Sequence, residues 1–300
     1  MTSFRAIVTA ASVAAVPLVA GCTARAGVDE SFDTVRVTGS DTMVNVAQAW
    51  AEAFNGLHAD ISIPVKGGGS GVGIADLCAG KIEIATASRA MKPDEIERAK
   101  KNTGEDPKQF IAGRDALAIY VNLNNPIESI SIEQLAEIYG EGGNTTRWEQ
   151  LGVENSACPS GKIVRISRQN SSGTYAYFKE AVLGKKRDYK QGFTAQSGSS
   201  DLVALVTKTP CAIGYSGMGY RTPDVKVLPV AKTKDSPPIE PTIESAQDGS
   251  YPISRPLYLY TLGEPTGAVQ EFIQWILSDE GQRIVEEQGY IPVHPPSENP

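Results

Sequence analysis

The sequence predicts an α/β protein of two lobes. Short strands alternate with helices along most of the 300 residues, a pattern typical of a sheet covered by helices. Two apolar, extended stretches, Asp115–Asn122 and Ser254–Thr261, lie far apart in the chain, and we interpret them as strands that cross between the lobes. We therefore expect residues 34–116 and 256–300 to form lobe 1 and residues 117–255 to form lobe 2.

The chain begins with an export signal. One early positive charge precedes an apolar run, residues 6–20, which is too short to span a bilayer comfortably. Val19-Ala20-Gly21-Cys22 resembles the lipobox of bacterial lipoproteins, which implies cleavage before Cys22 and a lipid anchor on its sulfur. The alternative is an ordinary secreted protein in which Cys22 merely lies near the cut. We expect a lipoprotein signal peptide over residues 1–21, a tether over residues 22–33, and a protein anchored at the cell envelope, in the periplasm or on the outer face of the cytoplasmic membrane.

Charge and composition exclude several functions. The formal net charge is -7, and removal of residues 1–21 takes away Arg5 and no acid, so it becomes -8. Such a chain does not attract nucleic acid or anions in general, so any anion must be held by local geometry. The two histidines stand alone and no cysteine has CxxC or CxxH spacing, so we expect no metal site. We also expect no cofactor, and a monomer.

Three cysteines remain after the anchor. In an oxidising compartment one pair can bridge and one cysteine is left over. Cys158 and Cys211 both lie in expected loops of the central third, and we expect them to form the disulfide. Cys78 lies in an amphipathic run and is expected to be a small buried hydrophobic residue.

Three turns of lobe 1 carry small hydroxyl residues or glycines between a strand and a helix. A helix start leaves N–H groups unpaired and carries a partial positive charge, so anions bind there. At the carboxyl edge of an α/β sheet such turns form a ligand crevice. The expected strand, turn and helix units are Thr34–Thr38, Gly39–Thr42 and Val44–Phe54; Ile61–Val65, Lys66–Gly73 and Ile74–Ala79; and Lys81–Thr86, Ala87–Met91 and Pro93–Lys101.

Each turn also has a plain structural interpretation. Ser40 or Asp41 can be the N-cap of the helix that follows, and Arg89 can be a solvated surface charge. The glycines of Lys66–Gly73 can form a flexible loop without function. Their spacing departs from the dinucleotide-binding fingerprint, from the P-loop and from the G-x-S-x-G nucleophile turn, so these three functions are excluded.

One turn of lobe 2 carries the same signal with a charge added. Arg168–Thr174 separates an expected strand, Lys162–Ser167, from an expected helix, Tyr175–Leu183. The planar fork of an arginine matches an oxyanion, and hydroxyls and glycine let the backbone approach it. The alternative is a turn with Ser or Thr as a simple N-cap. The other elements expected in lobe 2 are a helix Ile132–Tyr139, a turn Trp148–Leu151, a polar loop Thr194–Ser200, a helix Leu202–Thr207, and strands Ala212–Tyr215 and Val225–Val230.

In order and spacing, these four turn motifs resemble the phosphate-binding proteins of bacterial Pst-type ABC transporters. The resemblance extends to Ser131–Tyr139 before Trp148 and to Trp275–Gln282 before Gly289-Tyr290, and it covers nearly all of the mature chain. It implies a type II periplasmic-binding-protein fold, with two lobes joined by two crossing strands. It also implies capture of inorganic phosphate between the lobes and delivery to the permease of an ABC transporter.

Carried over residue by residue, the resemblance implies one set of phosphate ligands. They are Ser40, Asp41, Thr42, Ser70, Gly71, Ser88, Arg89, Arg168, Ser171, Ser172, Gly173 and Thr174. Two positions depart from part of the family: Arg89 stands where some members have an Asp that accepts the phosphate proton, and Asn170 stands where some have an Asp. Asp41 is the candidate replacement for the proton acceptor, and its rival role is to cap the first helix.

Two other functions stay open at this level. The same fold could bind sulfate, molybdate or tungstate, which the sequence separates only weakly from phosphate. A serine hydrolase or phosphatase would need a base or a metal, and the chain offers only His58 and His294, neither of them at a triad-like turn. We therefore expect a binding protein and not an enzyme.

Overall fold

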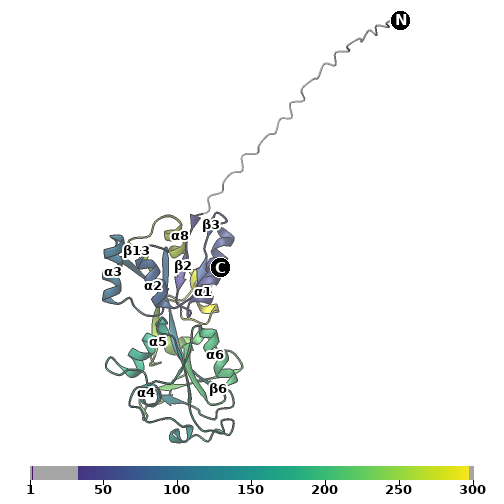
Figure 1. Ribbon diagram of the computed structural model, residues 1–300, viewed down its shortest axis with the longest axis vertical. Coiled ribbons are helices and arrows are strands. Elements are labelled where there is room, and N and C mark those ends of the chain that lie inside the picture. Colours follow the sequence, from purple (N-terminus) through teal and green to yellow (C-terminus); the bar gives the residue numbers. More distant parts are fainter. Residues whose placement is uncertain (1, 3–32, 297–300) are drawn as a thin grey trace. The chain divides into compact units, whose positions relative to one another are not determined.

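A computed structural model describes Thr2 and residues 33–296. Residues 33–296 belong to one compact unit, Phe32–Pro300. The expected signal peptide, the tether and Cys22 lie outside the described residues, except for Thr2 and Asp33. The compact unit has the predicted two-lobed α/β fold (Figure 1). Lobe 1 appears there in purple, blue and yellow because both ends of the described chain contribute to it, and lobe 2 appears in teal and green.

Lobe 1 is built on a parallel set of three strands with helices around it. β2 (Val37–Gly39) lies between β4 (Val65–Lys66) and β5 (Ile84–Ala87), and it pairs with both in parallel. A small separate sheet pairs β1 (Asp33–Thr34) with β3 (Ile61–Ser62). The helices are α1 (Val44–Leu57), α2 (Ser70–Cys78), α3 (Pro93–Thr103), α8 (Gly267–Ile276) and α9 (Asp279–Glu287).

Lobe 2 repeats the plan with different strands. β10 (Ala212–Gly217) and β9 (Thr194–Gln196) flank β8 (Val164–Arg168), and both pair with it in parallel. The other strands are β7 (Ile130–Ser131), β11 (Val225–Leu228) and β12 (Val230–Ala231). The helices are α4 (Ile132–Tyr139), α5 (Gly173–Phe178), α6 (Ser199–Lys208) and α7 (Ile243–Gln247), with a π-helical turn Lys179–Leu183 and 3₁₀ turns Trp148–Leu151 and Met218–Tyr220.

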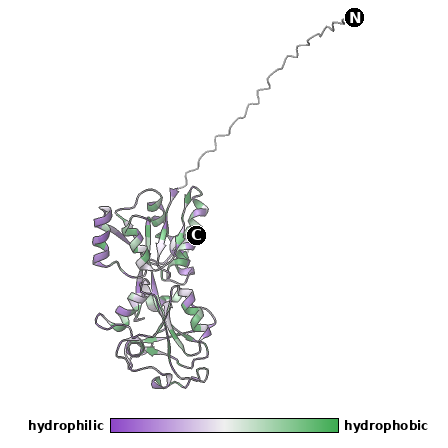
Figure 2. Cartoon of the chain, in the orientation of Figure 1, coloured by the Kyte–Doolittle hydropathy of each residue, from purple (hydrophilic) through white to green (hydrophobic). Residues whose placement is uncertain are grey.

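The two predicted crossing strands join the lobes into one sheet. β6 (Pro107–Asn122) pairs along its first part with β13 (Ser254–Leu262), and along its last part with β10 and β11. The strand order is β4-β2-β5-β13-β6-β10-β8-β9, with β11 also on β6. Apolar residues concentrate on these strands and on the inner faces of the helices (Figure 2). The hydrophobic clusters fall largely on one lobe or the other, and the boundaries 34–116 with 256–300 and 117–255 stay a prediction.

Some element predictions were wrong in a way that long-range pairing explains. The expected strand Thr34–Thr38 is two strands. The chain pairs with β3 before Arg36, as β1, and with β4 and β5 after it, as β2. Ile61–Val65 is likewise broken, since Pro64 has no N–H to give to a ladder. The expected polar loop Thr194–Ser200 instead supplies edge strand β9 and the start of α6.

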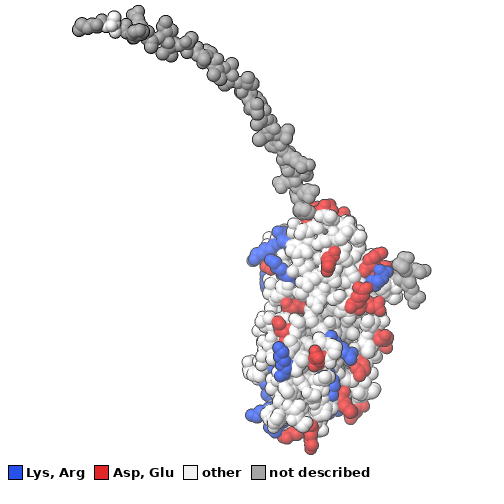
Figure 3. Space-filling model, turned by 90° about the vertical axis from the view of Figure 1, so that its right-hand side faces the viewer, with Lys and Arg blue, Asp and Glu red and all other residues white. Residues whose placement is uncertain are grey.

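The remaining cysteines lie in two kinds of environment. Cys158 and Cys211, the pair expected from the sequence, form a disulfide bond in lobe 2. Cys78 is a buried free thiol whose Sγ donates to the Glu95 carbonyl at 3.3 Å. None of the helices within residues 33–296 has the length and apolar character needed to cross a bilayer. On the face in Figure 3, acidic and basic side chains are interspersed.

Candidate functional site

Three serine hydroxyls of lobe 1 form a buried chain. Ser40 follows β2, Ser70 begins α2 and Ser88 follows β5, so the parallel strands bring all three to one edge of the sheet. The Ser40 hydroxyl donates to Ser88 Oγ at 3.0 Å, and Ser70 Oγ lies 3.3 Å from Ser88 Oγ. Two hydrogen bonds use two of the three hydroxyl hydrogens, so one hydrogen remains for another acceptor.

A pair of threonine hydroxyls connects the lobes. Thr42 Oγ1, from the turn after β2, lies 2.8 Å from Thr174 Oγ1, from the first turn of α5. Both side chains are buried. This contact and the serine chain bring together hydroxyls from every turn singled out in the sequence.

Arg168 supplies a buried positive charge at the end of β8. Its side chain is 0% exposed, and it donates to Ser199 Oγ at 2.7 Å, to the Gln196 carbonyl at 3.3 Å and to the Ser197 carbonyl at 2.5 Å. Across the lobes it donates to Asp41 Oδ2 at 2.9 Å. Burial lowers the pKa of Arg168 and the Asp41 charge opposes this, but a guanidinium stays protonated in either case.

Backbone N–H groups at the helix starts complete the set of donors. Within residues 33–296, no hydrogen-bond acceptor is found for the N–H groups of Thr42, Ser70 and Gly173. All three residues are buried, and Ser70 and Gly173 are the first residues of α2 and α5. A buried N–H group without a partner is unfavourable, and at a helix start an anion satisfies it. The arrangement therefore favours an oxyanion at this position.

The glycine turns bring the two lobes into close contact. The Gly71 N–H donates to the Ser171 carbonyl at 2.9 Å, so in this structure that amide joins the lobes. A Cβ on Gly69 would lie 2.6 Å from the same carbonyl, and a Cβ on Gly173 would lie 2.3 Å from Ser70 Oγ. Both glycines are needed because side chains would hold the lobes apart.

Two predicted ligands have local structural roles in this structure. The Ser172 hydroxyl accepts from the N–H groups of Thr174 and Tyr175, so it is the N-cap of α5. The Arg89 guanidinium donates to both oxygens of Glu95, at 2.8 and 2.7 Å. Its expected role as a phosphate ligand stays a prediction. Glu95 lies in the first turn of α3, where its carboxylate also accepts the Lys92 N–H. This local partner for the arginine lies only six residues along the chain.

Asp41 does not cap the first helix. The N-cap of α1 is Met43, without a side-chain cap, so the capping alternative for Asp41 is wrong. Its Oδ1 accepts the Gly68 N–H at 2.8 Å and its Oδ2 accepts from Arg168. A carboxylate has about four lone-pair positions, so these two bonds leave room for one more donor.

Sequence reasoning missed four residues of the site. Asp115 and Arg255 form a buried ion pair, Ser199 holds Arg168, and the Tyr220 hydroxyl donates to the Asp41 carbonyl at 2.5 Å. The first two could have been found, because each is a charged residue at the start of an apolar strand already assigned as a crossing. Ser199 and Tyr220 carry no such signal.

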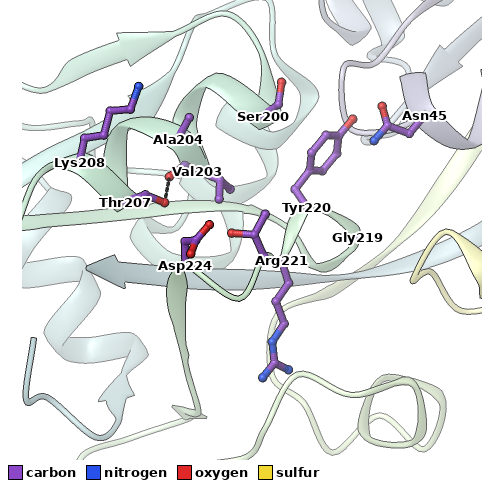
Figure 4. Close-up of a pocket in the computed structure, with 11 residues that line it drawn as sticks. Asn45, Ser200, Val203, Ala204, Thr207, Lys208, Gly219, Tyr220, Arg221 and Asp224 are labelled. Atoms are coloured by element: carbon purple, nitrogen blue, oxygen red, sulfur yellow. Dashed lines mark hydrogen bonds between the residues drawn. The ribbon is translucent and has the colours of Figure 1, made fainter. Parts of the chain in front are cut away.

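A cavity beside Tyr220 is a feature separate from the predicted phosphate ligands. It has a volume of about 370 Å³, and it is lined by α6, the turn Met218–Tyr220 and residues that follow (Figure 4). Tyr220 and Asn45 lie together at one end, whereas the Arg221 guanidinium points away from the other labelled side chains. None of the predicted phosphate ligands lines this cavity.

Comparisons with known proteins agree with the fold. Residues 24–280 match the family model described as PBP superfamily domain. The chain is 34% identical over 266 residues to the phosphate-binding protein PstS of Pseudomonas aeruginosa, covering 85% of this chain and 81% of that protein. It is 32% identical over 259 residues to the phosphate-binding protein PstS of Staphylococcus epidermidis, covering 84% and 77%.

Solved structures of phosphate transport receptors are also similar to this chain. A structure from Clostridium perfringens, described as a phosphate ABC transporter substrate-binding protein with bound phosphate, has a TM-score of 0.77 and 31% identity, covering 87% of this chain and 100% of that chain. An ABC-type phosphate transport receptor from Vibrio cholerae has a TM-score of 0.67 and 28% identity, covering 86% and 99%. A two-lobed α/β fold with oxyanion donors where the lobes meet defines a periplasmic-binding-protein-like receptor. Within that class, the chain belongs to the family of PstS phosphate-binding proteins, which are substrate-binding proteins for transport.

Proposed function

We propose that this protein captures one inorganic phosphate between its lobes and delivers it to the permease of an ABC transporter. The observation that carries the proposal is a group of buried donors. They are the N–H groups of Thr42, Ser70 and Gly173, one hydroxyl hydrogen left over in the serine chain, one left over in the Thr42–Thr174 pair, and the Arg168 guanidinium. Four of the five N–H groups of Arg168 have protein acceptors, which leaves one for the anion.

The test is a calorimetric titration of the mature chain, beginning after Cys22 and stripped of bound ligand by unfolding and refolding. We expect tight one-to-one binding of phosphate that excess sulfate does not displace. Displacement by sulfate, molybdate or tungstate would keep the fold and change the substrate. No heat with any of these anions would contradict the whole proposal.

We propose that the Asp41 carboxylate accepts a hydrogen bond from the P–OH group of the bound phosphate. Near neutral pH phosphate keeps a proton and sulfate does not, so a carboxylate at the site accepts from the P–OH group and repels sulfate. Asp41 is already paired with Arg168 and keeps free lone pairs. In Asp41→Asn we expect the ratio of sulfate to phosphate Kd to fall by about tenfold or more. An unchanged ratio would remove Asp41 from this role.

We further infer that the site is not catalytic. Neither histidine is near the hydroxyls: His58 stacks on Phe54 with ring centroids 4.2 Å apart, and His294 Nε2 lies 2.9 Å from the Leu277 carbonyl. A hydroxyl nucleophile without an adjacent base is weak. Sustained release of phosphate from a chromogenic ester, lost in both Ser70→Ala and Ser172→Ala, would contradict this inference.

We also propose that the mature protein is a monomer tethered to the membrane through a lipid on Cys22. The lipobox-like sequence Val19-Ala20-Gly21-Cys22 supports the lipid tether. Cells grown with labelled palmitate should incorporate label into the wild type and not into Cys22→Ser. Equal labelling of both proteins, or of neither, would contradict the anchor.

A further inference from the structure

A buried ion pair links the two crossing strands beside the proposed phosphate site. Asp115 on β6 and Arg255 on β13 face each other in register, and their side chains are 0% and 1% exposed. Arg255 donates through Nε and Nη2 to Asp115 Oδ2, at 3.1 and 2.8 Å. Asp115 Oδ1 accepts the Met218 N–H at 3.1 Å. Because the two charges cancel, the pair adds little net attraction for an anion.

Arg255 nevertheless touches both lobes of the site. Its Nη1 donates to the Ser88 carbonyl at 3.1 Å. Its Nη2 donates to Thr42 Oγ1 at 3.3 Å, in lobe 1, and to Thr174 Oγ1 at 3.0 Å, in lobe 2. Nη2 carries two hydrogens and one of them faces Asp115, so the other is shared between the two threonine oxygens.

This shared hydrogen determines where the threonine hydrogens point. A guanidinium only donates, so both threonine oxygens act as acceptors toward Arg255. One threonine also donates to the other across 2.8 Å. The second hydroxyl hydrogen then has no acceptor within the described part of the chain. It is available to a ligand, as a donor only.

We propose that Arg255 is a positioning residue for anion capture: in the closed form it orients the Thr42 and Thr174 hydroxyls so that one of them donates to the bound anion. The proposal rests on the function proposed above. The threonines lie on different lobes, so the two hydroxyls meet on Arg255 only when the lobes are closed. Arg255 on the crossing strand thereby couples closure to the orientation of the hydroxyl donor that the anion receives.

The test is a double-mutant cycle in phosphate affinity. Arg255→Lys keeps the charge and removes the fork, and we expect it to weaken phosphate binding by about tenfold to a hundredfold. In the Thr42→Val/Thr174→Val background, the same change should have almost no further effect, because the hydroxyls through which Arg255 acts are absent. A purely structural role for Arg255 would give equal losses in both backgrounds and would overturn the proposal.

Arg165→Lys is the matched control. Arg165 also lies on a strand and donates to two carbonyl oxygens, those of Lys190 and Gln191, but none of its contacts is at the site. Its phosphate Kd should equal that of the wild type. If Arg255→Lys does not fold, the threonine double variant decides alone: an unchanged phosphate Kd overturns the proposal, since Arg255 would have no hydroxyl to act through.

The outcomes separate this proposal from the proposed function. A wild-type protein that binds no phosphate contradicts the function itself. A wild-type protein that binds phosphate tightly, with Arg255→Lys indistinguishable from it, keeps the function and removes the role of Arg255.

Discussion

The two lobes contribute different groups to the proposed anion site. Lobe 1 supplies neutral donors from three turns, each following a short parallel strand, together with the Asp41 carboxylate. Lobe 2 supplies the positive charge of Arg168 and a single helix start, α5. The partners that hold Arg168 belong to its own lobe except Asp41. We therefore expect the charge to be positioned before the lobes close, and the contact between Thr42 and Thr174 to form on closure.

Removing the charge of lobe 2 should have the largest effect. In Arg168→Ala the anion loses its buried cation and Asp41 is left as an unpaired negative charge facing it, so we expect phosphate to bind at least about a hundredfold more weakly. Calorimetric titration measures this. Arg165→Ala is the control and should bind normally, because Arg165 lies on the same strand and its side-chain bonds within residues 33–296 go to the Lys190 and Gln191 carbonyls. Near-normal binding by Arg168→Ala would reverse the assignment of charge to lobe 2.

The disulfide tests whether the lobes differ in stability as well. Cys158 and Cys211 close a loop with a sequence separation of 53, all within lobe 2. A loop of this length stabilises the folded state by about 4 kcal/mol in the chain-entropy model, so Cys158→Ser/Cys211→Ser should lower the unfolding free energy by up to that amount. Urea denaturation measures it. Phosphate affinity at low denaturant should be unchanged, because neither cysteine contacts the site residues; a parallel loss of affinity would contradict this separation.

Gly173→Ala should block closure from the side of lobe 2. The added Cβ would lie 2.3 Å from Ser70 Oγ and 2.5 Å from Ser88 Oγ, so the lobes cannot approach as they do here. Overpacking of this kind costs about 1–3 kcal/mol, which corresponds to roughly tenfold to a hundredfold weaker binding. Small-angle X-ray scattering with saturating phosphate should show a more open protein than the wild type. Gly56→Ala, where a Cβ meets nothing within 4 Å, is the control.

The smallest effect is expected at Glu95, in lobe 1 but outside the site. Burial raises the pKa of Glu95, but hydrogen bonds from Arg89 and the Lys92 N–H outweigh it and place the pKa below its ordinary value of 4.5. Ionised Glu95 therefore stabilises the fold above pH 4.5, and this contribution disappears as the pH falls through the lowered pKa. Glu95→Gln should cost about 1 kcal/mol at pH 7 and progressively less in acid.

Thermal unfolding of the wild type and of Glu95→Gln between pH 3 and pH 7 measures this difference in stability. The range includes the pH at which an ordinary Glu carboxyl is protonated. Phosphate affinity should not change at pH 7. A loss of affinity in Glu95→Gln would mean that the Arg89–Glu95 pair belongs to the anion site after all.

Elements with strong local signals were predicted well from the sequence. The helix Ile132–Tyr139 and the turn Trp148–Leu151 have the expected bounds. Ser131 and Gln134 form a capping box, with bonds of 3.1 and 2.8 Å, and such a signal acts over only three residues. The crossing strands were also recognised from their apolar runs, but the predicted Asp115–Asn122 is only the second half of β6, which begins at Pro107.

The amino-acid sequence by itself determined the two-lobed α/β class and the four turns where hydroxyls, glycines and Arg168 gather, since these depend on residue type and short-range spacing. Only the tertiary structure decided the long-range partners: Asp41 with Arg168, and Arg255 with Asp115 and the two threonines. The physical reason is that a charged group pairs with the polar or oppositely charged group that the fold brings within about 4 Å. For Asp41 and Arg168 that partner lies 127 residues away along the chain.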